Sequence, residues 1–125
     1  MPVTRSTDAP TWDVPGTRFI GLASPRRGGS VETALWRIVM TAGTPATRHS
    51  VTRTEVFTVV AGCASAALEG EEYVLGVGDT LVVPPDTQFE LGNPGTEPFE
   101  AIVAFPAGGR AAMPQGNPFT PPWSE

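Results

Sequence analysis

The sequence predicts an all-β protein: a small antiparallel barrel of short strands with extended arms at both ends. Three observations predict this fold. Fourteen prolines and 14 glycines interrupt 125 residues, so every regular element must be short. Apolar and polar residues alternate along several segments, as in half-buried strands. Turn residues close these segments at intervals of about 8 to 12 residues, which is typical of sandwiches and barrels. A chain of this length forms one domain and buries a core without disulfides.

The first 16 residues, MPVTRSTDAPTWDVPG, predict an arm that lies over the body of the protein. They contain three prolines and no hydrophobic period, and Trp12 is the residue expected to anchor them. Residues 17–24, TRFIGLAS, predict the first strand, and residues 25–30, PRRGGS, a turn or exposed loop.

Residues 31–43, VETALWRIVMTAG, predict the next strand. Their apolar residues follow a period of two. One face carries Ala34, Trp36, Ile38 and Met40, and the other carries Leu35, Arg37 and Val39. A helix is the alternative, because Val31, Leu35 and Ile38 also stand at helical spacing. The β-formers and the Gly-Thr-Pro stop at 43–45 favour the strand.

Seven further short segments, each closed by Gly, Pro or Asn or by a turn, complete the barrel over residues 17–106. Glu69-Gly70 predicts a two-residue hairpin turn. The segments are residues 46–51, 55–62, 63–70, 71–79, 80–87, 88–95 and 99–108.

The C-terminal tail, residues 107–125, has no period. Prolines at 114, 118, 121 and 122 exclude a helix there, so the tail should run extended over the surface with Phe119 or Trp123 docked.

Composition removes several classes of function. Eight arginines against 13 carboxylates give a net charge of −5 without a basic cluster, so nucleic acid is not an expected partner. The chain has no lysine, which excludes Schiff-base chemistry and a P-loop lysine. The single cysteine, Cys63, excludes a disulfide or a cysteine metal cluster within one chain. No apolar run of membrane-spanning length and no signal-peptide pattern occur, so we expect a cytoplasmic protein without a membrane partner.

One stretch, GTPATRHSVTRTEVFTVVAG at residues 43–62, holds the only histidine of the chain. It resembles the first motif of the cupin superfamily, G-x5-H-x-H-x3-E-x6-G, with matches at Gly43, His49, Glu55 and Gly62. Val51 stands at the second histidine position. Residues 78–93 resemble the second motif, G-x5-P-x-G-x2-H-x3-N, where Gly78, Pro84 and Asn93 match, Asp86 takes the glycine position and Phe89 takes the histidine position.

The resemblance implies a cupin, or jelly-roll, β-barrel. In that family the three histidines and the glutamate of the motifs hold a divalent metal ion. This chain supplies only His49 and Glu55 at those positions, whereas Val51 and Phe89 offer no donor atom. Gln88 and Glu90 flank Phe89 and should face the other way. We therefore expect neither a metal nor another cofactor, and a metal, if one bound, would be held by His49 and Glu55.

Strand alternation predicts what surrounds these two residues. Positions 47, 49 and 51 share one face of a strand, as do 55, 57 and 59. The resulting interior is largely apolar. The residues expected to bind a ligand are Trp36, Thr47, Val51, Phe57 and Phe89.

The function predicted is binding of a small, largely apolar organic molecule in the barrel. One reading is a metal-independent isomerase, cyclase or lyase in which His49 is the catalytic acid or base and Glu55 orients it. A second reading is a non-catalytic binding or sensory module, in which the two residues form a hydrogen-bonded buried pair. A third is a metal-dependent oxygenase. We also expect a homodimer, because the outer face of residues 31–43 keeps Leu35 and Val39, and because the resemblance implies it.

Overall fold

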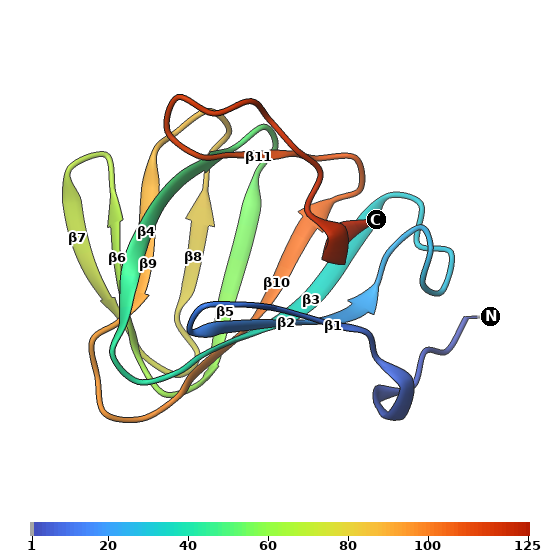
Figure 1. Cartoon of the computed structure of the whole chain (residues 1–125), viewed down its shortest axis with the longest axis horizontal. Coiled ribbons are helices and arrows are strands. Elements are labelled where there is room, and N and C mark those ends of the chain that lie inside the picture. Colours follow the sequence, from blue (N-terminus) through green and yellow to red (C-terminus); the bar gives the residue numbers. More distant parts are fainter. Residues whose placement is uncertain (1) are drawn as a thin grey trace.

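A computed structural model describes residues 2–125 and shows two antiparallel sheets packed face to face (Figure 1). The first sheet has six strands, in the spatial order β1 (Thr11–Val14), β2 (Thr17–Ala23), β3 (Thr33–Met40), β10 (Phe99–Pro106), β5 (Glu55–Ala61) and β8 (Thr80–Val83). The second has five strands, in the order β11 (Ala111–Ala112), β4 (Thr44–Val51), β9 (Phe89–Asn93), β6 (Ala64–Leu68) and β7 (Glu71–Leu75). The predicted all-β jelly-roll fold is confirmed.

Alternation along the strands builds the core between the sheets. In β3 every second residue from Ala34 to Met40 is buried, and the residues between them face outward. β10 alternates in the same way and pairs with β3 from Phe99 opposite Met40 to Pro106 opposite Thr33. The period of two therefore identified a strand at residues 31–43, and the helical alternative is wrong.

Two turns show why the sequence closes the barrel where it does. Glu69 and Gly70 both have positive φ, 51° and 82°, and connect Leu68 to its partner Glu71, so the predicted hairpin is confirmed. Asp86, which takes the glycine position of the second motif, has a φ of 57°. Aspartate tolerates this left-handed conformation better than most residues, so it can occupy a turn position where the motif has glycine.

Asn93 fastens the end of β9 to neighbouring strands. Its side chain is fully buried; its Nδ2 donates to the carbonyl oxygens of Met40 at 3.2 Å and Glu97 at 2.8 Å. Its Oδ1 accepts from the backbone N–H of Gly95 at 3.1 Å. Such a residue satisfies buried backbone groups that no strand partner reaches.

The two arms are more regular than the sequence suggested. Residues 11–14 form strand β1, which pairs with β2 as an edge strand of the six-stranded sheet, after a short 3₁₀ helix at Ser6–Asp8. Trp12 lies next to Gly21 on β2. The arm is extended, as predicted, but the sequence did not indicate that it joins the sheet, because Pro10 and Pro15 bound a strand that is too short to show a period.

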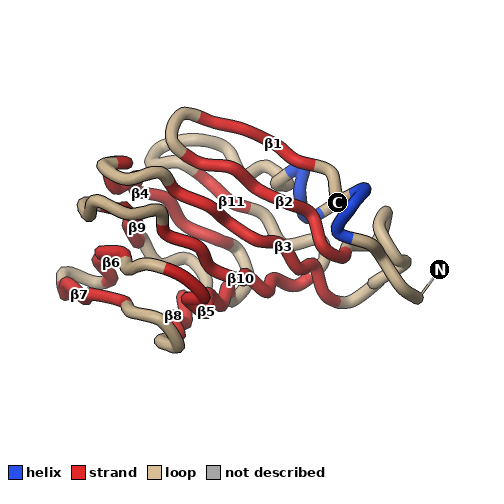
Figure 2. The backbone as a smooth tube through the Cα atoms, turned by 90° about the horizontal axis from the view of Figure 1, so that it is seen from below, coloured by secondary structure: helices blue, strands red, loops and turns tan. Residues whose placement is uncertain are grey.

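The tail also departs from its prediction. Its β11 pairs with β4, and a 3₁₀ helix spans Pro122–Ser124 (Figure 2). The prolines do not exclude this helix, because Pro122 stands in its first turn, where no backbone N–H is needed. No helix within residues 2–125 is long and apolar enough to span a membrane.

Candidate functional site

A cavity of about 740 Å³ lies between the two sheets. Its size falls within the range of pockets that hold small molecules. Its walls come from β2 to β5, β9 and β10, from the turns at 14–17 and 41–45, and from the C-terminal tail. The lining is mainly apolar, and its aromatic side chains are Phe19, Trp36, Phe57, Phe105, Phe119 and Trp123.

His49 reaches the cavity from β4. Its ring lies against Phe89, with 4.2 Å between ring centroids, and its Nδ1 is 3.4 Å from the carbonyl oxygen of Thr47. A carbonyl only accepts hydrogen bonds, so in this contact Nδ1 carries the hydrogen and Nε2 of the neutral ring keeps a free electron pair. Burial lowers the pKa of His49, and the contact with Thr47 offsets part of that effect. The imidazole is therefore a neutral base at pH 7.

Glu55 reaches the same cavity from the first position of β5. Its side chain is only 6% exposed, and its Oε1 is buried without a hydrogen-bond partner in residues 2–125. Burial raises the pKa of this carboxyl to about 8. At pH 7 the group consequently retains its proton and can donate a hydrogen bond.

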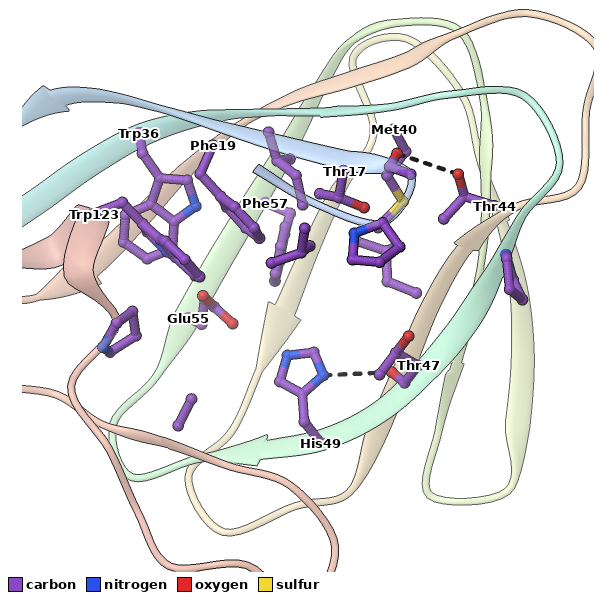
Figure 3. A pocket seen from close by; sticks show the side chains of 18 of the residues that line it. Thr17, Phe19, Trp36, Met40, Thr44, Thr47, His49, Glu55, Phe57 and Trp123 are labelled. Carbon is purple, nitrogen blue, oxygen red and sulfur yellow. Dashed lines mark hydrogen bonds between the residues drawn. The ribbon is translucent and has the colours of Figure 1, made fainter. Parts of the chain in front are cut away.

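The structure does not join His49 to Glu55. Both side chains point into the cavity, but across residues 2–125 no hydrogen bond or ion pair links them (Figure 3). The expectation that Glu55 orients the imidazole was wrong, because Nδ1 of His49 faces the carbonyl oxygen of Thr47 instead. The alternative of a hydrogen-bonded buried pair was wrong too, because Oε1 of Glu55 has no partner.

Four of the five residues expected to bind a ligand line the cavity, namely Trp36, Thr47, Val51 and Phe57. Phe89 does not. It is buried behind His49 and meets Phe57 edge-on, with 6.0 Å between ring centroids. Phe89 thus supports the imidazole from the side away from the cavity.

The sequence did not reveal that the tail forms one wall. The Trp123 ring stacks on Phe19, with 3.6 Å between centroids and 2° between planes, and meets Trp36 edge-on at 6.4 Å. Phe119 and Pro121 line the cavity beside them. The only sequence signal was the presence of aromatic residues in a proline-rich tail. It predicted that the tail docks on the barrel but not which residues of the barrel it contacts.

The donor atoms do not fit the four-ligand metal site of the motif. Val51 and Phe89 fill two of the four positions, and the His49 ring is inclined at 51° to the ring of Phe89. No three His, Cys, Asp or Glu side chains within residues 2–125 group so as to hold a metal ion. Glu90 pairs with Arg48 at 3.4 Å and does not line the cavity, in agreement with its predicted direction.

Comparison with known proteins identifies a family profile that matches this chain. The family profile described as "Cupin domain" matches residues 35–105. No curated protein matches the chain.

Solved structures share its fold. An RmlC-like cupin from Shewanella frigidimarina is 21% identical, with a TM-score of 0.72 over 83% of this chain and 88% of its own. The polyketide cyclase RemF from Streptomyces resistomycificus is 17% identical, with a TM-score of 0.74 over 85% and 79%. A salicylate 1,2-dioxygenase from Pseudaminobacter salicylatoxidans is 23% identical, with a TM-score of 0.70 over 86% of this chain and 33% of its own.

Proposed function

This chain belongs to the cupin domain family, and we propose that its barrel binds a small, largely apolar organic molecule between the two sheets. The observation that carries this proposal is the cavity of about 740 Å³, whose lining is mainly apolar and includes only two titratable side chains, His49 and Glu55. Apolar pockets with a few polar groups are the usual form of small-molecule sites. Similar structures include a cyclase and a dioxygenase, so the fold itself does not select one chemistry.

We further propose that the site transfers protons without a metal, as an isomerase, cyclase or lyase does. His49 Nε2 has a free electron pair to take a proton from the substrate, and the protonated Glu55 has a proton to give. In an isomerisation, His49 would take a proton from a carbon beside a carbonyl, and Glu55 would protonate the oxygen to form an enol. Return of a proton from His49 to another carbon, and of the enol proton to Glu55, would restore both residues. Each step balances without a further reactant.

Binding is tested with N-phenyl-1-naphthylamine, an uncharged dye whose emission rises in apolar surroundings. We expect one dye per chain, and we expect Thr47→Trp to weaken the binding at least about 10-fold by filling the cavity beside His49. Arg48→Trp is the matched control, because Arg48 is the next residue of β4 and does not line the cavity. Equal loss in both variants, or no dye binding at all, would refute the proposed cavity function.

Proton transfer is tested with 2-tetralone, an uncharged bicyclic ketone with acidic C–H groups. The protein should accelerate exchange of these protons for deuterium in heavy water, and His49→Ala should reduce the rate to that of buffer. Glu90→Gln, on a carboxylate outside the cavity, should leave the rate unchanged. Tight binding of the ketone without acceleration would favour the non-catalytic binding module.

The oxygenase alternative is tested by metal analysis. We expect less than about 0.1 equivalent of iron, manganese, nickel or zinc in protein purified without chelator, because one imidazole and one carboxyl fall short of the three ligands such sites require. One equivalent of metal that is lost in His49→Ala would overturn both the metal-free mechanism and the assignment of His49 as a base.

A further inference from the structure

We propose that the cavity selects uncharged aromatic carbonyl compounds, and that the carbonyl oxygen takes a hydrogen bond from Glu55. This inference rests on the proposed binding function and adds the chemical class of the ligand. Three features of the cavity carry it: the charges that its lining lacks, the unpartnered carboxyl, and the position of the aromatic rings.

The first feature concerns charge. The cavity lining contains no arginine, and the chain has no lysine. Arg48, which neighbours His49 in sequence, is paired with Glu90 and stays out of the lining. A carboxylate, phosphate or sulfate group brought into the cavity would lose its water without gaining a cationic partner, which is strongly unfavourable. The cavity therefore disfavours anions.

The second feature is the carboxyl of Glu55. A polar atom that is buried without a partner leaves a hydrogen bond unmade. Because no cationic side chain of residues 2–125 lines the cavity beside it and its Oε1 is buried, the carboxyl is stable in its neutral form, as the pKa of about 8 indicates. A neutral carboxyl offers one O–H donor, and a ketone or ester oxygen accepts it. A protonated amine would instead require Glu55 to ionise. Ionisation in this apolar site carries the same desolvation cost that keeps Glu55 neutral in the free protein.

The third feature is the aromatic wall near Glu55. Figure 3 shows Trp36, Phe19 and Trp123 on the side of the cavity where Glu55 lies, whereas His49 enters from the opposite strand. The parallel rings of Phe19 and Trp123 are held face to face, and Trp36 meets Trp123 at 66°. Such a wall gives a flat ligand ring both faces and edges to pack against. An aromatic ring that packs there lies on the same side of the cavity as the Glu55 carboxyl.

The experiment compares four ligands with one bicyclic skeleton: tetralin, 2-tetralone, 2-aminotetralin and 1,2,3,4-tetrahydro-2-naphthoate. Binding is followed by tryptophan fluorescence in a Trp12→Phe background, so that all tryptophan emission comes from Trp36 and Trp123, both of which line the cavity. We expect 2-tetralone to bind about 10-fold tighter than tetralin, and the carboxylate and the ammonium form of the amine to bind more weakly than tetralin.

Variants of Glu55 show whether its O–H group causes the preference for 2-tetralone over tetralin. Glu55→Gln keeps an N–H donor and should retain the affinity for 2-tetralone within about 3-fold. Glu55→Leu should remove the preference for 2-tetralone over tetralin, and Glu90→Gln should change nothing. If the leucine variant fails to fold, the pH dependence decides the question: 2-tetralone should bind the wild type more weakly above about pH 8, where the carboxyl ionises, and should bind Glu55→Gln equally below and above that pH. Equal pH profiles for the two proteins would refute the role of Glu55.

Several results would overturn the inference. The carboxylate binding as tightly as the ketone would refute the exclusion of anions. The amine binding most tightly, with release of one proton and loss in Glu55→Gln, would identify a cation site instead. If N-phenyl-1-naphthylamine binds but none of the four ligands does, the ligand class is wrong while the binding function stands. If the dye fails as well, the binding function fails with it.

Discussion

Glu55 makes the stability of the protein depend on pH. Its pKa is about 8 in the folded protein, against 4.5 for the free side chain. Between these values the folded state binds more protons than the unfolded state, so the free energy of unfolding falls as pH rises from about 4.5 to about 8. A shift of this size corresponds to at most about 5 kcal/mol.

The prediction is checked by urea denaturation of the wild type and of Glu55→Gln between pH 5 and pH 9. The wild type should lose stability over this range, and the glutamine variant should show a flatter profile and be the more stable protein at pH 9. Parallel profiles for the two proteins would show that Glu55 does not titrate in this range.

At the residue scale, spacing predicted which side chains enter the cavity but not how they meet. Alternation correctly placed Thr47, Val51 and Phe57 on the inner faces. It did not predict the separation of His49 and Glu55, because that separation depends on how far β4 and β5, in different sheets, lie apart across the barrel. Phe89 was assigned to the lining by its motif position, and its large ring instead fills the space behind His49.

At the scale of the elements, two motif glycines offer a matched test. Gly43 and Gly62 both have positive φ, 78° and 72°. A Cβ at Gly43 would meet open space, whereas a Cβ at Gly62 would collide with the carbonyl oxygen of Pro98 in the backbone before β10. We expect Gly43→Ala to cost about 1 kcal/mol, from conformation alone, and Gly62→Ala more than about 3 kcal/mol. Chemical denaturation measures both, and equal costs would contradict the crowding at Gly62.

The tail supplies a second prediction at this scale. Trp123→Ala removes the ring stacked on Phe19 and should lower the free energy of unfolding by about 2 to 3 kcal/mol. It should also abolish most of the binding of N-phenyl-1-naphthylamine, since one wall is lost. Trp123→Phe keeps a stacking ring and should cost less than about 1.5 kcal/mol. A stable alanine variant with unchanged dye binding would show that the tail does not shape the cavity.

The strands were predictable because each carries its own alternation and its own turn residues. All the barrel strands from β2 to β10 fall within the segments expected from sequence, apart from the first two residues of β4. β1 and the helix at Pro122–Ser124 were not predicted, because elements of three or four residues are too short to show a hydrophobic period. Contacts with distant segments stabilise them instead. The cavity wall formed by the C-terminal tail was not predicted for the same reason, because Phe19 and Trp123 are about 100 residues apart in sequence.

For the molecule as a whole, the homodimer stays a prediction. The outer face of the six-stranded sheet carries half-buried Leu35 and Val39 around the ion pair of Arg37 with Glu100, whose atoms lie 3.1 Å apart. A second copy covering this face would give a particle of twice 13.1 kDa in light scattering. Leu35→Glu should then yield monomers, and Val74→Glu on the other sheet should not. A wild-type mass of one chain at about 50 μM would contradict the dimer.

The stacking of Phe19 on Trp123 links the order of synthesis to the completion of the pocket. β2 leaves the ribosome before the tail, so the wall that the two share is absent until residue 123 has followed. Until then the Phe19 and Trp36 rings lack the Trp123 ring that they contact in the folded protein, and one apolar side of the pocket stays uncovered. If the proposed ligand is present at that moment, it has an open side through which to enter, and the tail would then pack behind it.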